Sequence, residues 1–224
     1  LKGLGVAAPA VSIGQERLAA LAKSMSNLTA RQDEFVSSVF EGTQIAGRGS
    51  VLFRDGTASR GEMDFYTQAM DRHDGGPTTR DRMIRYLEEA PTLAIPAVKR
   101  ALDEACLTVG EVDHLVMVSC TGFAAPGVDI ALIEQLGFKR TISRSNIGFM
   151  GCHGAINGLR VVDGLCQEKM YFSAVWSCAA CITHIGGTLS VLLPTRFLQM
   201  ALDQWSVQVT RVVWVGVYLI QVVV

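Results

Sequence analysis

Residues 145–160 read Ser145-Asn-Ile-Gly-Phe-Met-Gly-Cys-His-Gly-Ala-Ile-Asn-Gly-Leu-Arg160. An apolar run ends just before this stretch at Ile142, and glycines at 148 and 151 flank a short turn that leads to Cys152. Beyond the turn, apolar residues recur at helical spacing and are predicted to share one face: Ala155, Ile156, Leu159, Val162 and Cys166. The stretch therefore predicts a strand, a tight glycine turn, a cysteine and a helix, in that order.

The position of Cys152 predicts a reactive thiol. The cysteine falls where the unpaired N–H groups and the positive dipole end of the predicted helix would face it. This field favours the thiolate, which is the nucleophilic form of cysteine. The alternative is a small buried apolar side chain, which is how most free cysteines behave. Glycine is costly inside regular structure, so glycines on both sides of Cys152 favour a turn that local geometry requires.

Composition indicates a globular chain with a large apolar core. The chain has 224 residues, of which 49% are hydrophobic, and its net charge is −1. This near-neutral balance gives no reason to expect nucleic acid or an anionic membrane surface as a partner. No basic flank followed by a long apolar run marks a secretory signal. We therefore expect the six cysteines to be reduced thiols of a cytoplasmic protein.

Patterns along the chain predict helices that alternate with strands. Strands are predicted at 1–8, 50–53 and 112–119, and helices at 12–24, 29–40, 80–87, 94–106 and 126–136. Residues 42–49 are predicted to form a loop. The helix at 94–106 has an alanine-rich apolar face, which predicts close packing against another element. This alternation is typical of an α/β layered fold.

Several motifs resemble the N-terminal part of a type III polyketide synthase, the chalcone/stilbene synthase-like family of the thiolase superfamily. Shorter matches are Gly3-Leu-Gly5, Pro77-Thr-Thr-x-x-Arg-Met83 and Glu89-Ala-Pro91. Two longer matches are more specific. They are His114-Leu-Val-x-Val-Ser-Cys-Thr-Gly122 with Ala125-Pro-Gly-Val-Asp129, and Ile147-Gly-Phe-Met-Gly-Cys152 with Asn157-Gly-Leu-Arg160.

The resemblance implies a thiolase-like layered αβαβα fold and an acyl-transfer function. It implies that Cys152 is the catalytic nucleophile, loaded from a coenzyme A thioester and extended with malonyl-CoA. Cys120 and Thr121 match positions that line the substrate cavity, although Cys120 is equally well explained as an inert thiol at the end of a strand. Phe149 is expected to belong either to the cavity wall, as a substrate-binding residue, or to the core. The resemblance implies CoA thioesters as small-molecule partners, a homodimer, and no cofactor.

The resemblance ends near Gln167. The family needs a histidine and an asparagine from its C-terminal half, which polarise the malonyl thioester and stabilise the carbanion left by decarboxylation. After Gln167 the chain has one histidine, His184, in surroundings that do not match, and no asparagine. We therefore interpret residues 1–167 as the chalcone/stilbene synthase-like domain, one thiolase-like half of an incomplete fold. Residues 168–224 are interpreted as a divergent tail.

A shifted reading frame explains this tail. One permitted codon choice for residues 175–182, read from the third base of the first codon, gives the family string Val-Glu-Leu-Cys-Ser-Leu-His. The same shift over residues 193–201 gives a second family string, Ala-Asn-Ala-Leu-Phe-Ala-Asp-Gly, in the right order. We therefore expect a frameshift between Gln167 and Tyr171. Cys178, Cys181 and His184 have a zinc-like spacing, but they lack a fourth ligand, and no metal site is predicted.

Three functions follow from these patterns. The first is a type III polyketide synthase-like acyltransferase, with this chain truncated and impaired. The second is a catalytically inactive fragment or pseudoenzyme, because the polarising histidine and asparagine are missing. The third is a related ketoacyl synthase-type condensing enzyme. The sequences at 148–152 and 119–122 favour the polyketide branch over the third function.

Overall fold

The structure is a computed structural model that describes residues 2–42, 46–53, 65–66, 68–71, 74, 76–119, 122–150, 154–167, 174–178 and 219–223. These residues fall into two compact units. The first unit contains a five-stranded sheet with its helices, and the second contains a two-stranded sheet with two helices. Phe149, a predicted site residue within the described ranges, belongs to the first unit.

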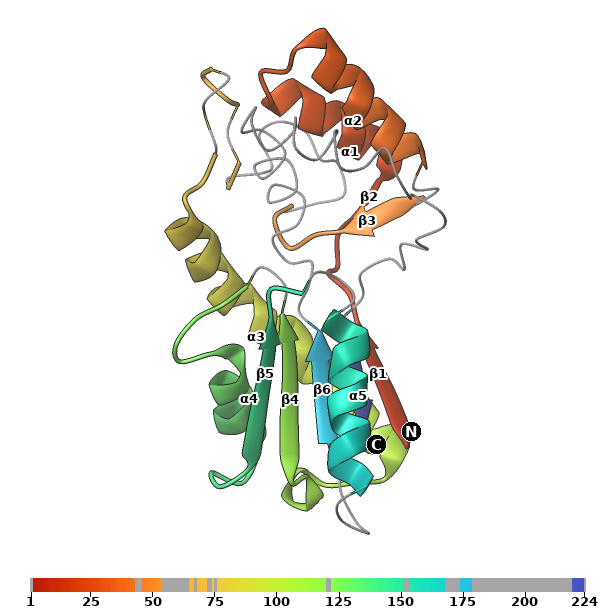
Figure 1. Ribbon diagram of the computed structural model, residues 1–224, viewed down its shortest axis with the longest axis vertical. Helices are drawn as coiled ribbons and strands as arrows, with labels where there is room; N and C mark the ends of the chain where they lie inside the picture. The colour runs from red at the N-terminus through yellow and green to blue at the C-terminus, as the bar shows by residue number, and fades with distance from the viewer. Residues whose placement is uncertain are drawn as a thin grey trace. The chain divides into compact units, whose positions relative to one another are not determined.

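The first unit is built on strands at Gly3–Ala7 (β1), His114–Ser119 (β4), Ser143–Gly148 (β5), Ala174–Cys178 (β6) and Leu219–Val223 (β7). Their order in the sheet is β1-β7-β6-β4-β5 (Figure 1). β4 is parallel to both β5 and β6, whereas β7 is antiparallel to β1 and β6. β4 is buried from His114 to Val118, as expected for a strand covered on both faces. The predicted buried strand at 112–119 is therefore confirmed.

Helices cover this sheet. α3 spans Thr79–Ala105, α4 spans Val128–Leu136, and α5 spans Gly154–Gln167. α5 contacts β4, β5 and β6, and Figure 1 shows it in front of the sheet with α3 passing behind. Helices layered on a largely parallel sheet are the α/β architecture that the sequence predicts.

Strand β1 packs against the alanine face of α3 through its glycines. A Cβ atom on Gly3 would overlap the carbonyl oxygen of Ala101, and one on Gly5 would overlap that of Ala97. Only glycine permits so close an approach of strand backbone to helix backbone. Ala97 and Ala101 have no solvent exposure. The predicted close packing of the alanine-rich helix is confirmed.

α3 is one continuous helix where the sequence predicts two. Proline inside a helix removes a hydrogen bond and clashes with the preceding turn, yet α3 runs through Pro91 and Pro96. The buried residues of α3 continue across both prolines at helical spacing, so tertiary packing outweighs the local cost. They are Tyr86, Ala90, Pro91, Ala94, Ala97, Val98, Ala101 and Leu102. The prediction of separate helices at 80–87 and 94–106 is therefore wrong.

Strand β5 lies in a stretch that has no apolar pattern. The apolar run ends at Ile142, but the strand runs from Ser143 to Gly148 and contains no buried residue. Within the described sheet, β5 is an outer strand that pairs with β4. A strand at an edge, with its side chains partly in water, can be polar. Hydropathy therefore placed the strand too early.

α5 confirms the predicted helix but buries a different face. The buried positions are Gly154, Gly158 and Val162, which are one helical turn apart. Ile156 is 51% exposed and Leu159 is 37% exposed. The apolar side predicted for residues 155–166 is therefore only partly buried. The contact with the sheet selects small residues that let the helix lie close, rather than the most apolar ones.

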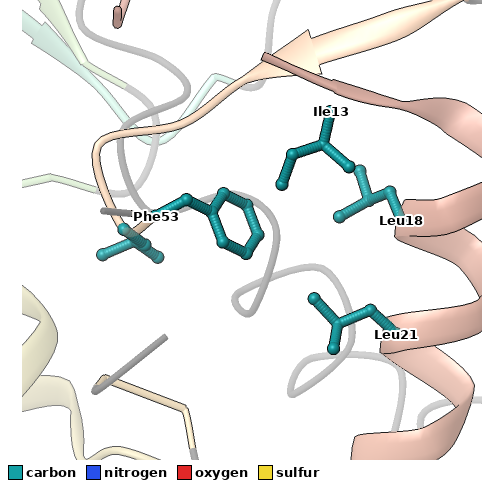
Figure 2. Close-up of a cluster of buried hydrophobic side chains, with 5 residues drawn as sticks. Ile13, Leu18, Leu21 and Phe53 are labelled. Atoms are coloured by element: carbon teal, nitrogen blue, oxygen red, sulfur yellow. The ribbon is translucent and has the colours of Figure 1, made fainter. Parts of the chain in front are cut away.

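The second unit has its own core. β2 (Ser12–Gly14) pairs antiparallel with β3 (Gly47–Gly49), next to α1 (Gln15–Met25) and α2 (Ala30–Gly42). The buried cluster consists of Ile13, Leu18, Leu21, Leu52 and Phe53. Figure 2 shows Ile13, Leu18, Leu21 and Phe53 directed toward a common interior.

Short elements of the second unit depart from the predictions. The helix predicted from residue 12 begins at Gln15, because Ser12–Gly14 pair with Gly47–Gly49. The predicted loop at 42–49 therefore ends in a strand. The predicted strand at 50–53 contains a turn. The second predicted helix is confirmed with Thr29 before its first turn: Thr29 Oγ1 accepts from the Gln32 N–H at 3.4 Å.

Candidate functional site

The candidate site lies at the carboxyl edge of two parallel strands. Ser119 and Gly148 are the last residues of β4 and β5, and they stand opposite each other in the sheet. In open α/β sheets, ligands bind outside the carboxyl ends of the strands. Cys120, Thr121 and Cys152 follow these ends in the sequence but lie outside the described residues. The described part of the site is the chain on either side of them.

The loop after β4 is anchored on α3. The Gly122 N–H donates to Ser119 Oγ at 3.1 Å, and a Cβ at Gly122 would overlap the buried ring of Tyr86. The next residue, Phe123, donates its N–H to Met83 Sδ at 3.2 Å. These contacts fix the backbone of the loop while the Phe123 ring stays 50% exposed.

The loop after β5 places Phe149 at the same edge. Phe149 has φ +60°, a left-handed conformation that non-glycine residues adopt at a cost of about 1–3 kcal/mol. Its side chain is 76% exposed, and its ring centroid lies 5.5 Å from that of Phe123, with the planes tilted by 51°. Sequence reasoning singled out Phe149 but missed Phe123, because one phenylalanine in a loop has no periodic signal.

The start of α5 is tied to this second loop. α5 begins at Gly154, two residues after Cys152. Asn157 Nδ2 donates to Met150 Sδ at 3.2 Å, and Arg160 donates to Asn157 Oδ1 at 3.3 Å. The Asn157–Met150 contact therefore joins the first turns of α5 to the described end of the loop after β5.

Two polar pairs connect β5 to its neighbours. Arg144 on β5 forms a 2.6 Å ion pair with Asp129 in the first turn of α4. At the amino end of β4, His114 Nε2 lies 2.9 Å from Ser145 Oγ. Burial lowers the pKa of His114, so its neutral form is favoured. Both pairs hold the strand that leads into the site.

Other features of the described chain lie away from this edge. A cavity of about 410 Å³ is lined by Lys99 on α3, Gln135 on α4 and Val109 in the short helical turn Val109–Glu111 that precedes β4. No group of three His, Cys, Asp or Glu residues in the described ranges is placed to hold a metal ion. Within the same ranges, no helix is long and apolar enough to cross a membrane. Cys181 and His184, which have zinc-like spacing, lie outside the described residues.

Comparison with known sequences identifies the family. A family model for the chalcone and stilbene synthases, N-terminal domain, matches residues 4–187. The chain belongs to this family. The match continues past Gln167, where the motifs predicted that the resemblance would end. The resemblance inferred from the motifs is thereby confirmed.

Curated relatives of the family are polyketide synthases. "Alpha-pyrone synthesis polyketide synthase-like Pks18" of Mycobacterium tuberculosis (strain ATCC 25618 / H37Rv) is 45% identical over 101 residues, which are 45% of this chain and 26% of that protein. "Type III polyketide synthase A" of Arabidopsis thaliana is 28% identical over 173 residues, 75% of this chain and 41% of that protein. The chain thus spans well under half of these relatives.

Solved structures of the family share the fold. 1,3,6,8-tetrahydroxynaphthalene synthase from Streptomyces coelicolor A3(2) has a TM-score of 0.71 at 22% identity, over 99% of this chain and 55% of that one. PKS-I from the brown alga Ectocarpus siliculosus has a TM-score of 0.67 at 28% identity, over 80% of this chain and 46% of that one. The predicted thiolase-like α/β fold is confirmed, and the chain spans about half of these proteins.

Proposed function

We propose that this chain carries the acyl-loading part of a type III polyketide synthase, with Cys152 as the nucleophile. One observation supports this most directly. Residues 149–153 connect the carboxyl end of β5 to the first turn of α5, and Phe149 contacts Phe123 in the loop that follows β4. Cys152 is thus two residues from the start of a fourteen-residue helix, whose N-terminal N–H groups and dipole favour a thiolate.

The proposed loading step is a thioester exchange. The Cys152 thiolate attacks the carbonyl carbon of an acyl-CoA, and a tetrahedral oxyanion forms. When it collapses, the bond from carbon to the CoA sulfur breaks, and CoA leaves as a thiolate that takes up a proton from water. The acyl group is then held on Cys152 as a new thioester. Because one thioester replaces another, the exchange is reversible.

Extension is proposed to use malonyl-CoA. Loss of CO₂ leaves the enolate of acetyl-CoA, whose carbon attacks the acyl thioester and releases the Cys152 thiolate. In the family, a histidine and an asparagine stabilise this enolate, and one such donor is typically worth about 3 kcal/mol. Residues 168–224 contain no asparagine and only His184. The family model matches as far as residue 187. We propose that a frameshift nevertheless falls between Gln167 and Tyr171, so this chain loads but does not extend.

The cavity residues, the substrates and the oligomeric state are proposed from membership of the family. Cys120, Thr121 and Phe149 are proposed to line the cavity that receives the acyl group. Acyl-CoA and malonyl-CoA are the proposed substrates, without a cofactor. A homodimer in the cytoplasm is the proposed state, and light scattering on the purified protein tests the dimer.

Intact-mass spectrometry after incubation with an acyl-CoA tests the loading step. We expect one acyl adduct, which Cys152→Ala abolishes. Cys106→Ala is the matched control, because Cys106 is an exposed free cysteine outside the site and its loss should leave the adduct unchanged. An adduct that persists in Cys152→Ala would contradict the proposal.

The same assay with malonyl-CoA added tests the proposed impairment. We expect the adduct on Cys152 without released polyketide. Full turnover by this chain would contradict the impairment, whereas an unreactive Cys152 would favour an inactive pseudoenzyme. Sequencing the transcript between Gln167 and Tyr171 tests the shifted frame, and an uninterrupted frame that encodes the printed residues would exclude it.

A further inference from the structure

Two aromatic rings at the carboxyl edge contact each other while both remain in water. Phe123 is 50% exposed and Phe149 is 76% exposed, and their centroids are 5.5 Å apart. Single exposed apolar side chains are common on protein surfaces. An exposed pair contributed by two different loops is less usual and indicates a surface that receives an apolar group.

The backbone holds this pair in place. Phe123 is fixed through its N–H bond to Met83 Sδ and through the adjacent Gly122, which packs on the Tyr86 ring. Phe149 keeps a left-handed φ of +60°, although most residues avoid this region. Backbone strain of this kind is concentrated at functional sites. The rings are therefore presented by anchored loops.

Chain connectivity restricts what the pair can contact. Phe123 follows Thr121 by two residues, and Phe149 precedes Cys152 by three. Because each residue spans at most about 3.6 Å, the Cα atoms of Phe149 and Cys152 are at most about 11 Å apart. An acyl group on the Cys152 sulfur therefore lies within reach of the rings.

The area of the pair favours a small apolar occupant over a protein. One phenylalanine buries at most roughly 250 Å², and both rings are already partly covered. A stable protein interface buries about 1,000 Å² or more. A flexible alkyl chain needs only these two ring faces and no polar partner.

We infer that Phe123 and Phe149 together hold the alkyl chain of the acyl group loaded on Cys152, and that this aromatic pair sets a preference for longer acyl chains. The inference rests on the proposed loading function. Phe123 is the residue that it adds to the site. Long chains offer many methylene groups to both rings, whereas an acetyl group offers a single methyl.

Competition between acyl-CoAs tests this inference. The full chain is incubated with an equimolar mixture of acetyl-, hexanoyl- and dodecanoyl-CoA, and the adducts are measured by intact mass at early times. Wild type should favour the dodecanoyl adduct over the acetyl adduct. Phe123→Ala and Phe149→Ala should each lower this ratio about fivefold, as expected for the loss of part of an apolar contact. The double variant should lose little more than either single variant, because the rings act as one unit.

Matched variants separate a specific effect from a general one. Phe123→Leu keeps an apolar side chain and should retain most of the preference. Leu87→Ala removes another partly exposed apolar side chain, on α3 of the same unit, and should leave the ratio unchanged. Thermal unfolding followed by circular dichroism checks that each variant is folded.

The possible outcomes distinguish the inference from the function on which it rests. Normal loading with an unchanged chain-length ratio in both alanine variants overturns the inference and leaves the function intact. Absence of any adduct on wild-type Cys152 overturns both. A changed molar mass in light scattering, with an unchanged ratio, would assign the pair to a contact between copies and overturn the inference.

Discussion

The guanidinium of Arg144 on β5 lies 2.6 Å from the carboxylate of Asp129, whose side chain is only 3% exposed. Replacing Arg144 with Met should leave this buried carboxylate without its cation. We expect the free energy of unfolding to fall by about 1–3 kcal/mol, the typical cost of a buried polar group that loses its partner. Urea unfolding of wild type and Arg144→Met measures the difference.

A second ion pair provides the control for this prediction. Lys139 Nζ lies 3.5 Å from Asp113 Oδ1, and both side chains are nearly half exposed. Lys139→Met should change the free energy of unfolding by less than about 0.5 kcal/mol, because water screens an exposed pair. Equal losses of unfolding free energy in the two variants would show that burial of Asp129 does not increase the contribution of its ion pair to stability.

Gly5→Ala should destabilise the first unit by about 1–3 kcal/mol, the usual cost of overpacking. The added methyl would overlap the carbonyl oxygen of Ala97, which belongs to helix backbone and cannot rotate away. Gly164→Ala on α5 is the matched control, since its Cβ would meet nothing within 4 Å. It should be neutral or stabilising by up to about 1 kcal/mol, because alanine favours helix. Denaturant midpoints that rank the two variants in reverse would contradict the packing of β1 on α3.

His114 should make stability depend on pH. Burial lowers its folded pKa below the ordinary 6.5, so the unfolded chain binds more protons in the interval between the two values. The stabilising contribution is complete above the unfolded pKa and is lost as pH falls through the folded pKa. Unfolding free energies between about pH 7.5 and about pH 5 should therefore decrease in wild type and decrease less in His114→Gln.

Two carboxylates with lowered pKa values, Asp74 and Glu111, do not titrate in this pH range. Backbone hydrogen bonds lower the pKa of Asp74 and of Glu111, so their contributions are lost only below the ordinary carboxyl range. The range above about pH 5 therefore reports on the histidines, and the difference between wild type and His114→Gln isolates His114. An identical slope in wild type and His114→Gln would exclude His114 as its source.

The loss of unfolding free energy caused by Gly122→Ala should depend on the side chain at Tyr86. The alanine methyl would overlap the Tyr86 ring, which is 4% exposed and has little room to move. We expect a loss of about 1–3 kcal/mol for Gly122→Ala alone. In the Tyr86→Leu background the same change should cost about 1 kcal/mol less, because the clash is relieved. A double-mutant cycle by urea unfolding measures the coupling, and strict additivity would argue against the contact.

The sequence predicts the elements whose burial is complete. β4 is recognisable in the sequence because an uninterrupted apolar run is typical of a strand covered on both faces. β5 is not, because a polar outer strand has no hydropathy signal. The sequence predicts two helices in place of α3 because local rules penalise Pro91 and Pro96, whereas the buried face that keeps the helix continuous depends on tertiary packing.

The candidate site was predictable only in part. Phe149 was identified because it adjoins the glycine turn in the motif around Cys152. Phe123 and the Asp129–Arg144 pair depend on which loops and strands become neighbours, and no local pattern encodes that. The buried face of α5 also differs from its apolar side, because the sheet accepts Gly158 where a hydrophobicity pattern favours Leu159.

The packing of β1 on α3 also has a consequence for biosynthesis. On the ribosome, Gly3 and Gly5 emerge long before Ala97 and Ala101, so the first strand has no docking surface until the helix has left the exit tunnel. Until then its amide and carbonyl groups are solvated. The N-terminal strand therefore joins the nascent sheet late, and closing this long-range contact slows folding.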